Sequence, residues 1–366
     1  MEHNDTKNRK LDHIEICTKE DVQSWISAGF DDVTLIHQAL PELDIDMIDT
    51  KTSFFGKKID YPMMFAAITG GHERAKIINQ NIAYVAKSFN IPVGIGSQRA
   101  ALEDNTLRDT YKTVRDIAPD VFIVGNIGMS QIIENGVEIA KKSIEMVDAD
   151  AIAIHCNVLQ ELIQPEGDRK FRGSIGALSK IIENVEIPVI IKEVGSGISK
   201  ETATVLKEIG ISGIDVGGTG GTSWSAVEYY RAKAIVNEKY TALGKSFWNW
   251  GIPTVCSIVE CKNATKDATT IIATGGVKSG IDIAKSIALG ADVSAFAGAI
   301  LTSAQEGENQ LRDQIDLMIT ELKYSMALTG STVISHLKNA NLVITGKTAQ
   351  WLTSRGEDTT LFSRRR

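Results

Sequence analysis

Polar side chains gather where one apolar stretch of the sequence ends. The run 151–157 (AIAIHCN) finishes with His155 and Asn157, and Gln160 and Glu161 follow closely. Residues at positions i and i+2 of a strand share a face, so His155 and Asn157 reach a common site if either does. Glu161 could bind Mg²⁺ shared with substrate phosphates, because Mg²⁺ favours one or two carboxylates plus phosphate oxygens. An ordinary glutamate at a helix start would look the same.

Two glycine clusters indicate a phosphate site. The run 274–280 (TGGVKSG) offers consecutive backbone N–H groups and opens a helix, whose N-terminus carries positive potential. The run 217–222 (GGTGGT) ends an earlier apolar run, and Thr222 could add a hydroxyl to the same phosphate. Together the clusters indicate a large phosphorylated cofactor across one mouth. The alternative is that these glycines only form tight turns.

Lys192 follows the apolar residues 188–191, where a cation needs a partner. That partner could be a carboxylate inside the fold. It could instead be an electron-rich cofactor edge, such as the flavin edge near N1, where a cation stabilises the reduced anion. Both interpretations stay open at this point.

Arg9, Lys10 and His13 form a basic cluster in a polar segment. Alone, such a segment is usually solvated surface. Together with Arg99 it could clamp a diphosphate, because arginine offers a bidentate fork and lysine a mobile point charge. His72, which follows the turn 69–71, could line the same mouth.

The elements that must position these residues alternate regularly from residue 62 onward. Apolar runs that end in small polar residues are separated by amphipathic stretches, and such runs are typical of parallel strands buried on both faces. Eight units favour a closed TIM (β/α)8 barrel, an α/β fold, over an open sheet, and no G-x-G-x-x-G motif opens the first helix. In such barrels catalysis takes place at the C-terminal ends of the strands. The expected strand runs are 63–71, 92–99, 121–128, 151–157, 188–195, 213–221, 269–276 and 292–299, and the expected helices include 73–89, 135–147, 200–210 and 279–290.

Residues 1–366 contain no obvious linker, so we expect a single domain. Its barrel covers about 62–330, with an N-terminal extension over 1–61 and a C-terminal helical extension over 331–366. An insertion after the sixth strand, 222–253, is too long for an ordinary loop and carries Trp224, Trp248 and Trp250. It could be a lid over the site or a contact between subunits.

The composition of the 366 residues restricts the function class. Hydrophobic residues make up 43% and the net charge is −7, which supports a large core and argues against a nucleic-acid or membrane-surface protein. The N-terminus lacks an apolar leader, so we expect a cytoplasmic protein. The four cysteines show no metal-ligand spacing, and we expect them to be reduced and buried.

Taken in order, these residues resemble the flavin-dependent type 2 isopentenyl-diphosphate isomerase family. The resemblance extends from Arg9 to about Trp351. The segments that carry it are RKLDHI (9–14), AITGGH (67–72), GSQRA (96–100), GNIG (125–128), HCNVLQE (155–161), IKEVGSG (191–197), GGTGGTSW (217–224) and TGGVKSG (274–280).

The resemblance implies that the barrel holds FMN at its strand mouths, with Mg²⁺ on Glu161 and NADPH as the reductant. It also implies a homotetramer or homo-octamer. The FMN contacts would be Ala67, Ile68, Thr69, Ser97, Asn126, Lys192, Thr222, Gly276, Val277, Lys278, Ala297 and Gly298. The diphosphate substrate would be bound by Arg9, Lys10, His13, Ser97, Gln98, Arg99, His155, Asn157 and Gln160. The residues assigned to catalysis are Gln160, His155, Asn157 and Lys192.

Three positions depart from the family pattern: Ile68, Cys156 and Lys278, where Met, Leu and Arg are more common. Cys156 should face the helix layer and not the lumen. Lys278 keeps a positive charge near phosphate but loses the bidentate fork, which would weaken FMN binding.

The implied reaction is a 1,3-proton shift from isopentenyl diphosphate to dimethylallyl diphosphate, in isoprenoid biosynthesis and without net redox change. Gln160 could relay or position the proton, although an amide is a weak acid and base and the flavin is the stronger candidate. One alternative is an FMN-dependent α-hydroxy-acid oxidase or dehydrogenase, which is expected to carry a His–Arg pair that the run 217–224 lacks. The other is a non-catalytic barrel that binds flavin or phosphate.

Overall fold

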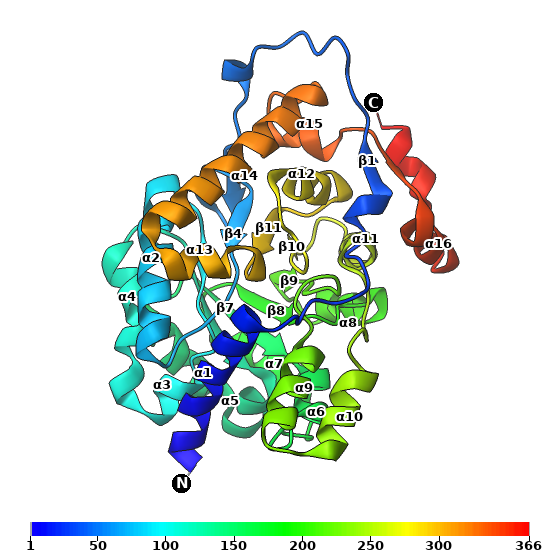
Figure 1. Cartoon of the computed structure of the whole chain (residues 1–366). Coiled ribbons are helices and arrows are strands. Elements are labelled where there is room, and N and C mark those ends of the chain that lie inside the picture. The colour runs from blue at the N-terminus through cyan, green and yellow to red at the C-terminus, as the bar shows by residue number, and fades with distance from the viewer. Residues whose placement is uncertain (1, 366) are drawn as a thin grey trace.

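The computed structural model describes residues 2–365 of the chain, with side chains from residue 10 onward. Its centre is a closed barrel of eight parallel strands, in the order β10-β11-β4-β5-β6-β7-β8-β9 (Figure 1). Every barrel strand falls within one of the eight runs expected from the sequence, so the TIM-barrel prediction is confirmed. The strands are β4 (Met63–Phe65), β5 (Val93–Gly94), β6 (Ile123–Gly128), β7 (Ala151–Cys156), β8 (Val189–Glu193), β9 (Gly213–Asp215), β10 (Thr270–Ala273) and β11 (Val293–Phe296).

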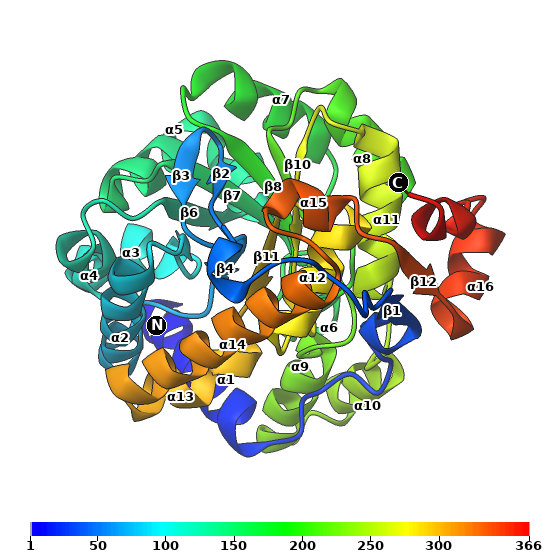
Figure 2. The ribbon, with the colours of Figure 1, turned by 90° about the horizontal axis from the view of Figure 1, so that it is seen from above.

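Helices surround the barrel and follow the strands in sequence (Figure 2). The expected helix 135–147 is present as the later part of a helical segment that begins at residue 129, directly after β6. It contains Gly136 at φ 65°, a left-handed conformation that breaks the helical pattern inside it. The barrel helices are α2 (Glu73–Phe89), α3 (Arg99–Glu103), α4 (Asp109–Ile117), α5 (Met129–Val147), α6 (Val158–Ile163), α7 (Ser174–Asn184), α8 (Lys200–Glu208), α11 (Thr254–Thr265), α12 (Gly280–Leu289), α13 (Leu301–Glu306) and α14 (Glu308–Leu328).

Two apolar cores hold the barrel together. The larger one lies between strands and helices, and the smaller one fills the barrel interior with residues such as Met64, Val124 and Ile190. A hairpin of β2 (Thr52–Phe54) and β3 (Lys57–Ile59) contributes Phe54 to the inner core, where its ring packs edge-on against Phe122 at 4.9 Å. This hairpin closes the end of the barrel where the strands begin. The C-terminal strand ends are therefore the end at which a site can open.

The two terminal extensions meet each other. Strand β1 (Val33–Leu35) pairs antiparallel with β12 (Leu342–Ile344), and α15 (Ile334–Lys338) and α16 (Gly346–Ser354) complete the C-terminal part. At the other terminus, α1 (Glu2–Lys19) contacts the insertion, which folds into α9 (Trp224–Ala234) and α10 (Glu238–Ser246). In Figure 1, α1, α6 and α9 lie at the lower end of the barrel. Short 3-10 segments occur at Phe30–Asp32, Ile45–Met47, Asn105–Leu107, Gly298–Ile300 and Thr359–Ser363.

Within residues 2–365, no helix has both the length and the apolar character needed to cross a bilayer.

Candidate active site

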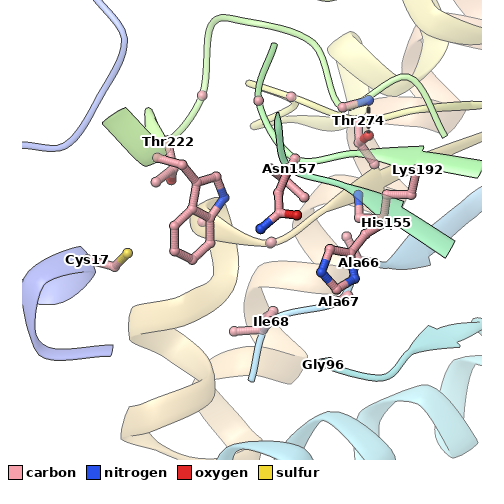
Figure 3. Close-up of a pocket in the computed structure, with 18 of the residues that line it drawn as sticks. Cys17, Ala66, Ala67, Ile68, Gly96, His155, Asn157, Lys192, Thr222 and Thr274 are labelled. Carbon is pink, nitrogen blue, oxygen red and sulfur yellow. Dashed lines mark hydrogen bonds between the residues drawn. The ribbon is translucent and has the colours of Figure 1, made fainter. Parts of the chain in front are cut away.

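A cavity of about 280 Å³ lies at the C-terminal ends of the barrel strands. One wall consists of strand ends and the glycine-rich segments that follow β9, β10 and β11. The opposite wall consists of residues from α1, α6 and α9. Figure 3 shows His155, Asn157 and Lys192 directed toward one space, with Thr222 and Cys17 on its other side. The cavity therefore joins the barrel to both the N-terminal helix and the insertion.

All twelve residues predicted to contact a flavin line this cavity. The turn 276–278 and the segment 297–298 approach Thr222, since a Cβ on Gly298 would lie 3.1 Å from its Oγ1. A Cβ on Gly221 would lie 2.6 Å from the backbone N of Gly276, so this approach needs glycine. Gly276 also has φ 71°, so its glycine serves a tight turn as well. The structure therefore shows the tight turn and the close approach, and the phosphate site stays a prediction.

Lys192 is paired inside the barrel and still lines the cavity. Its Nζ lies 2.8 Å from Oδ2 of Asp215, and the two side chains are 11% and 5% exposed. Thr274 donates its hydroxyl to Oδ1 of the same carboxylate and accepts the N–H of Gly217 at 2.8 Å. The carboxylate partner that the sequence left open is therefore Asp215. The register of β7, β8 and β9 aligns His155, Lys192 and Asp215 in one layer.

His155 is a neutral imidazole in this environment. Burial, with the nearby Lys10 and Lys192 cations, lowers the pKa of His155 to about 3. Asn126 donates its amide to the carbonyl of Ile95 at 3.0 Å, which leaves Oδ1 to accept from Nδ1 of His155 at 2.9 Å. His155 therefore keeps its proton on Nδ1, and Nε2 carries the free lone pair.

Gln98 and His72 lie elsewhere than the sequence predicted. Gln98 is fully buried and does not line the cavity: its amide donates to the carbonyl of Ser143 and accepts the N–H of Asn126, both at 2.8 Å. It supports Asn126 from behind, because the strand–helix junction turns its side chain inward. His72 caps α2, where Nδ1 accepts the N–H of Arg74 at 3.1 Å.

The basic residues predicted to bind diphosphate meet at one part of the cavity. Lys10 and His13 of α1 line it together with Ser97 and Arg99. Arg99 also pairs with Glu103 one turn along α3, at 2.7 Å. The side chain of Arg9 lies outside the described residues.

Asn157, Gln160 and Glu161 form a connected group on α6 and the residue before it. The amide of Asn157 donates to Oε1 of Gln160 at 3.2 Å and to Oε1 of Glu161 at 2.9 Å. The other Glu161 oxygen accepts the N–H of Asp168 at 2.7 Å. Among residues with described side chains, no group of three or more His, Cys, Asp or Glu could hold a metal ion. A cation on Glu161 would therefore need phosphate oxygens or water as its other ligands, as Mg²⁺ commonly has.

Glu228 is a site residue that the sequence analysis missed. It is fully buried on α9, and its Oε1 meets Nε2 of Gln160 at 3.1 Å and Nε2 of His13 at 3.3 Å. Burial alone would raise the pKa of Glu228, but His13, Arg231 and Gln160 together lower it to about 2. Burial lowers the pKa of His13. The one signal in the sequence was the length of the insertion, which suggested that it covers a site.

Of the three tryptophans in the insertion, one lines the cavity. Trp224 lines the cavity and packs edge-on against the ring of His13 at 5.1 Å, whereas Trp250 is 63% exposed. The insertion therefore has both a cavity face and an outer aromatic face.

All four cysteines are free thiols, as expected. Cys256 and Cys261 are buried. Cys17 and Cys156 are only partly so, and Cys17 lines the cavity, which corrects the expectation that all four are buried. Cys156 packs against the core between strands and helices and not in the lumen, which confirms its predicted orientation.

The cavity fits FMN by its own chemistry. The hydroxyl of Thr69 is buried on its wall with no hydrogen-bond partner among the described residues, so a polar ligand would satisfy it. The glycine-rich segments leave backbone close to the lumen, as a phosphate cradle requires. Ile68, Phe296 and Leu301 supply apolar wall for an aromatic ring.

Comparison with known proteins agrees with this geometry. The family description "FMN-dependent dehydrogenase" matches residues 157–344. The structure of mandelate oxidase with (S)-2-phenylpropionate matches this chain with a TM-score of 0.63 and 15% identity, over 93% of this chain and 98% of the other. The structure of mandelate oxidase with 3,3-difluoro-2-hydroxy-3-phenylpropionic acid matches with a TM-score of 0.62 and 15% identity, over 94% of this chain and 99% of the other. At that identity the likeness concerns the fold alone. The chain thus belongs, as a class, to the FMN-dependent dehydrogenase family of barrels.

Full-length relatives narrow the class further. The isopentenyl-diphosphate delta-isomerase of Archaeoglobus fulgidus is 46% identical over 351 residues, which cover 96% of this chain and 99% of that protein. The protein of the same name from Methanosarcina mazei is 45% identical, over 96% of this chain and 96% of that protein. The one from Thermococcus onnurineus is also 45% identical, over 95% of this chain and 94% of that protein. The chain belongs to the isopentenyl-diphosphate delta-isomerase family.

Proposed function

We propose that this chain converts isopentenyl diphosphate to dimethylallyl diphosphate by a 1,3-proton shift, with FMN, Mg²⁺ and NADPH as reductant. The observation that carries this proposal is the pairing of two walls across one cavity. The barrel wall carries the predicted flavin contacts. The wall from α1, α6 and α9 carries Lys10, His13, Gln160 and Glu161, and the buried, ionised Glu228 lies behind it in contact with Gln160 and His13. The His–Arg pair expected of a hydroxy-acid oxidase is absent from the run 217–224.

FMN would be held by the backbone of 276–278 and 297–298, with its ring near Thr69, Asn126 and Lys192. When bound and reduced, the flavin supplies a protonatable ring nitrogen next to an alkene. Lys192 places a positive charge at the barrel wall, and Asp215 keeps that charge fixed in a buried position.

The diphosphate would lie against Lys10, Arg99 and Ser97. His155 is neutral there and offers the lone pair of Nε2, so it would accept a hydrogen bond from a protonated oxygen of the diphosphate. Glu161 would hold Mg²⁺ together with phosphate oxygens, and the N–H of Asp168 orients its carboxylate. These contacts hold the diphosphate in place and restrain its loss as a leaving group.

The alkene would lie near Gln160 and Trp224. Glu228 is charged, so it can accept a proton but cannot donate one in its resting state. Gln160 accepts from Asn157 and donates to Glu228, so its amide is held in one orientation between them. Gln160 thus serves to position the reacting groups, and a Gln160→Ala variant with nearly unchanged turnover would remove it from the mechanism.

The first test is an anaerobic incubation of the FMN-loaded protein with isopentenyl diphosphate, Mg²⁺ and NADPH in D₂O, read by NMR. We expect dimethylallyl diphosphate with incorporated deuterium, formed only while the flavin is reduced. Bound and reducible FMN without product would contradict the proposal and favour an oxidase, to be tested with hydroxy acids. Bound FMN with neither product nor diphosphate binding would favour a non-catalytic barrel.

We also propose that the chain forms a homotetramer or homo-octamer in the cytoplasm. Trp25 and Trp250 are 66% and 63% exposed, and Trp25 stacks on Trp248 at 5.0 Å. This outer aromatic face of the insertion suits a contact between subunits. Light scattering on Trp250→Ser should show a smaller assembly than the wild type; an unchanged mass would place the contact elsewhere.

A further inference from the structure

Arg231 joins segments that are far apart in the sequence and has no role in the scheme above. Its Nη1 lies 2.6 Å from Oε2 of Glu228, and its Nη2 lies 2.7 Å from Oε1 of Glu166. Its Nε lies 4.0 Å from a carboxylate oxygen of Asp12 on α1. The Arg231 side chain is 16% exposed and Glu228 is fully buried, so water screens this pair only weakly, whereas Glu166 and Asp12 are 44% and 57% exposed and their contacts are screened more. One side chain thus connects α9, α1 and the segment after α6.

The segment after α6 leads to Glu161. Glu166 belongs to the turn 164–168, whose end at Asp168 donates its N–H to Oε2 of Glu161. A Cβ on Gly167 would lie 1.9 Å from the carbonyl oxygen of Glu161, so the turn packs directly on that residue. Arg231 therefore contacts Glu228 through Nη1, and through Nη2 it contacts Glu166 in the turn that packs on Glu161.

The charges around Glu228 come from each element packed on α9. Helix α1 presents His13, with Lys10 near it, and α6 presents the neutral Gln160. Arg231 lies on α9 itself, and on α10 Tyr240 bonds to Arg169, not to Glu228. His13 and Arg231 both lower the pKa of Glu228, His13 more strongly, and Arg231 is the one of the two whose charge does not depend on pH.

We propose that Arg231 is a positioning residue that holds Glu228 ionised behind Gln160 and His13 and, through Glu166, holds the turn that orients Glu161. This rests on the proposed function, because it assigns Arg231 to the same reaction. A lysine could supply the charge but not both contacts, since only the planar fork of arginine reaches two carboxylates at once. The contact with Glu228 should affect the pH profile, and the contact with Glu166 should affect the Mg²⁺ requirement, so the two effects can be separated.

The test uses FMN-loaded protein and three variants. For Arg231→Met we expect turnover to fall by about 10- to 100-fold, the acid limb of the pH profile to rise by about 1–3 units, and the Mg²⁺ concentration for half-saturation to increase. A buried carboxylate that loses its cation is protonated at higher pH, so activity is lost there first. Glu166→Gln should change the Mg²⁺ requirement alone, and Arg231→Lys should restore the acid limb but not the Mg²⁺ requirement.

A matched control removes another arginine from an ion pair. Arg312 lies 2.6 Å from Glu308 on α14, and Arg312→Met should leave the pH profile and the Mg²⁺ requirement as in the wild type. FMN content, measured by absorbance, checks that each variant folds. An acid limb that stays in place in Arg231→Met, or one that moves as far in Glu166→Gln, would overturn the proposal.

Calorimetry separates this proposal from the proposed function. Isopentenyl diphosphate titrated into the protein with Mg²⁺ should bind at least about 10-fold more weakly to Arg231→Met and to Glu166→Gln than to the wild type. If the wild type binds the diphosphate but forms no product, the proposed reaction is refuted. The difference in diphosphate binding between the wild type and the variants still tests the role of Arg231. Equal binding by all variants would refute the role of the turn.

Discussion

The ion pair between Lys192 and Asp215 gives a prediction with a defined size. In Asp215→Asn, the amide keeps the shape of the side chain and an acceptor for the hydroxyl of Thr274, but the negative charge is lost. Lys192 then holds an uncompensated charge in a site where its side chain is 11% exposed. Removing one partner of a buried pair typically costs about 3–5 kcal/mol. We expect a loss of that order in the free energy of unfolding.

The assay is chemical denaturation of FMN-free protein at one protein concentration, so that neither cofactor binding nor assembly contributes. The control is Asp116→Asn, which breaks an exposed pair with Lys112 at 3.6 Å whose side chains are 50% and 57% exposed. Its loss should stay within about 1 kcal/mol. A double variant, Lys192→Met with Asp215→Leu, removes both charges and should recover much of the stability, because no buried charge remains.

Two results would refute this reasoning. If Asp215→Asn costs no more than Asp116→Asn, then Lys192 is solvated or discharged without penalty and the barrel interior is wetter than its burial indicates. If the double variant is less stable than Asp215→Asn, packing and not charge determines the effect at this layer.

Three further predictions concern neighbouring features. Burial raises the pKa of Glu193 to about 7, although the N–H groups of residues 194–196 donate to its carboxylate and lower the pKa. The folded state therefore binds an extra proton between about pH 4.5 and 7. Thermal stability should therefore fall as pH rises through that window, and it should fall less in Glu193→Gln. Calorimetric scans at pH 5 and pH 8 measure this change, and an equal loss of thermal stability in the wild type and the variant would contradict the prediction. Glu161→Gln should raise the Mg²⁺ requirement in NMR assays of turnover with FMN content unchanged. Gly298→Val should lower FMN affinity in fluorescence titrations, because a Cβ there meets Thr222 at 3.1 Å before any larger group is added.

The barrel and its flavin-side wall could be predicted because both depend on local pattern. A strand buried on both faces is apolar throughout, and the residue at its C-terminal end is exposed to the mouth by topology alone. Lys192, near the end of β8, lines the cavity for that reason, and Thr222 does so from the glycine-rich segment that follows β9. The failures at Gln98 and His72 are local too. One side chain turns behind the strand to hold Asn126, and the other bonds to the start of its own helix.

Glu228 could not be found in this way. It lies in an ordinary helix, 68 residues from Gln160 and 215 residues from His13, and nothing in its neighbourhood marks it as buried. Which face of α9 points inward depends on how the insertion packs on α1 and α6. That packing is a tertiary property, so the charged partner of the site emerges only when all three helices are in place.

The two walls of the cavity therefore carry different parts of the chemistry. The barrel wall offers a cradle and a paired lysine, which suit a flavin whatever reaction follows. The selective groups lie on elements added to the barrel or to its loops: Lys10 and His13 on α1, Glu161 on α6, and Glu228 on α9. A barrel without α1 and the insertion would keep the predicted flavin contacts other than Thr222 and would lose the buried carboxylate together with the basic residues of α1. On the proposed function, the three helices that close the cavity adapt a flavin-binding barrel to alkene isomerisation, and Arg231 on α9 contacts both α1 and the segment after α6.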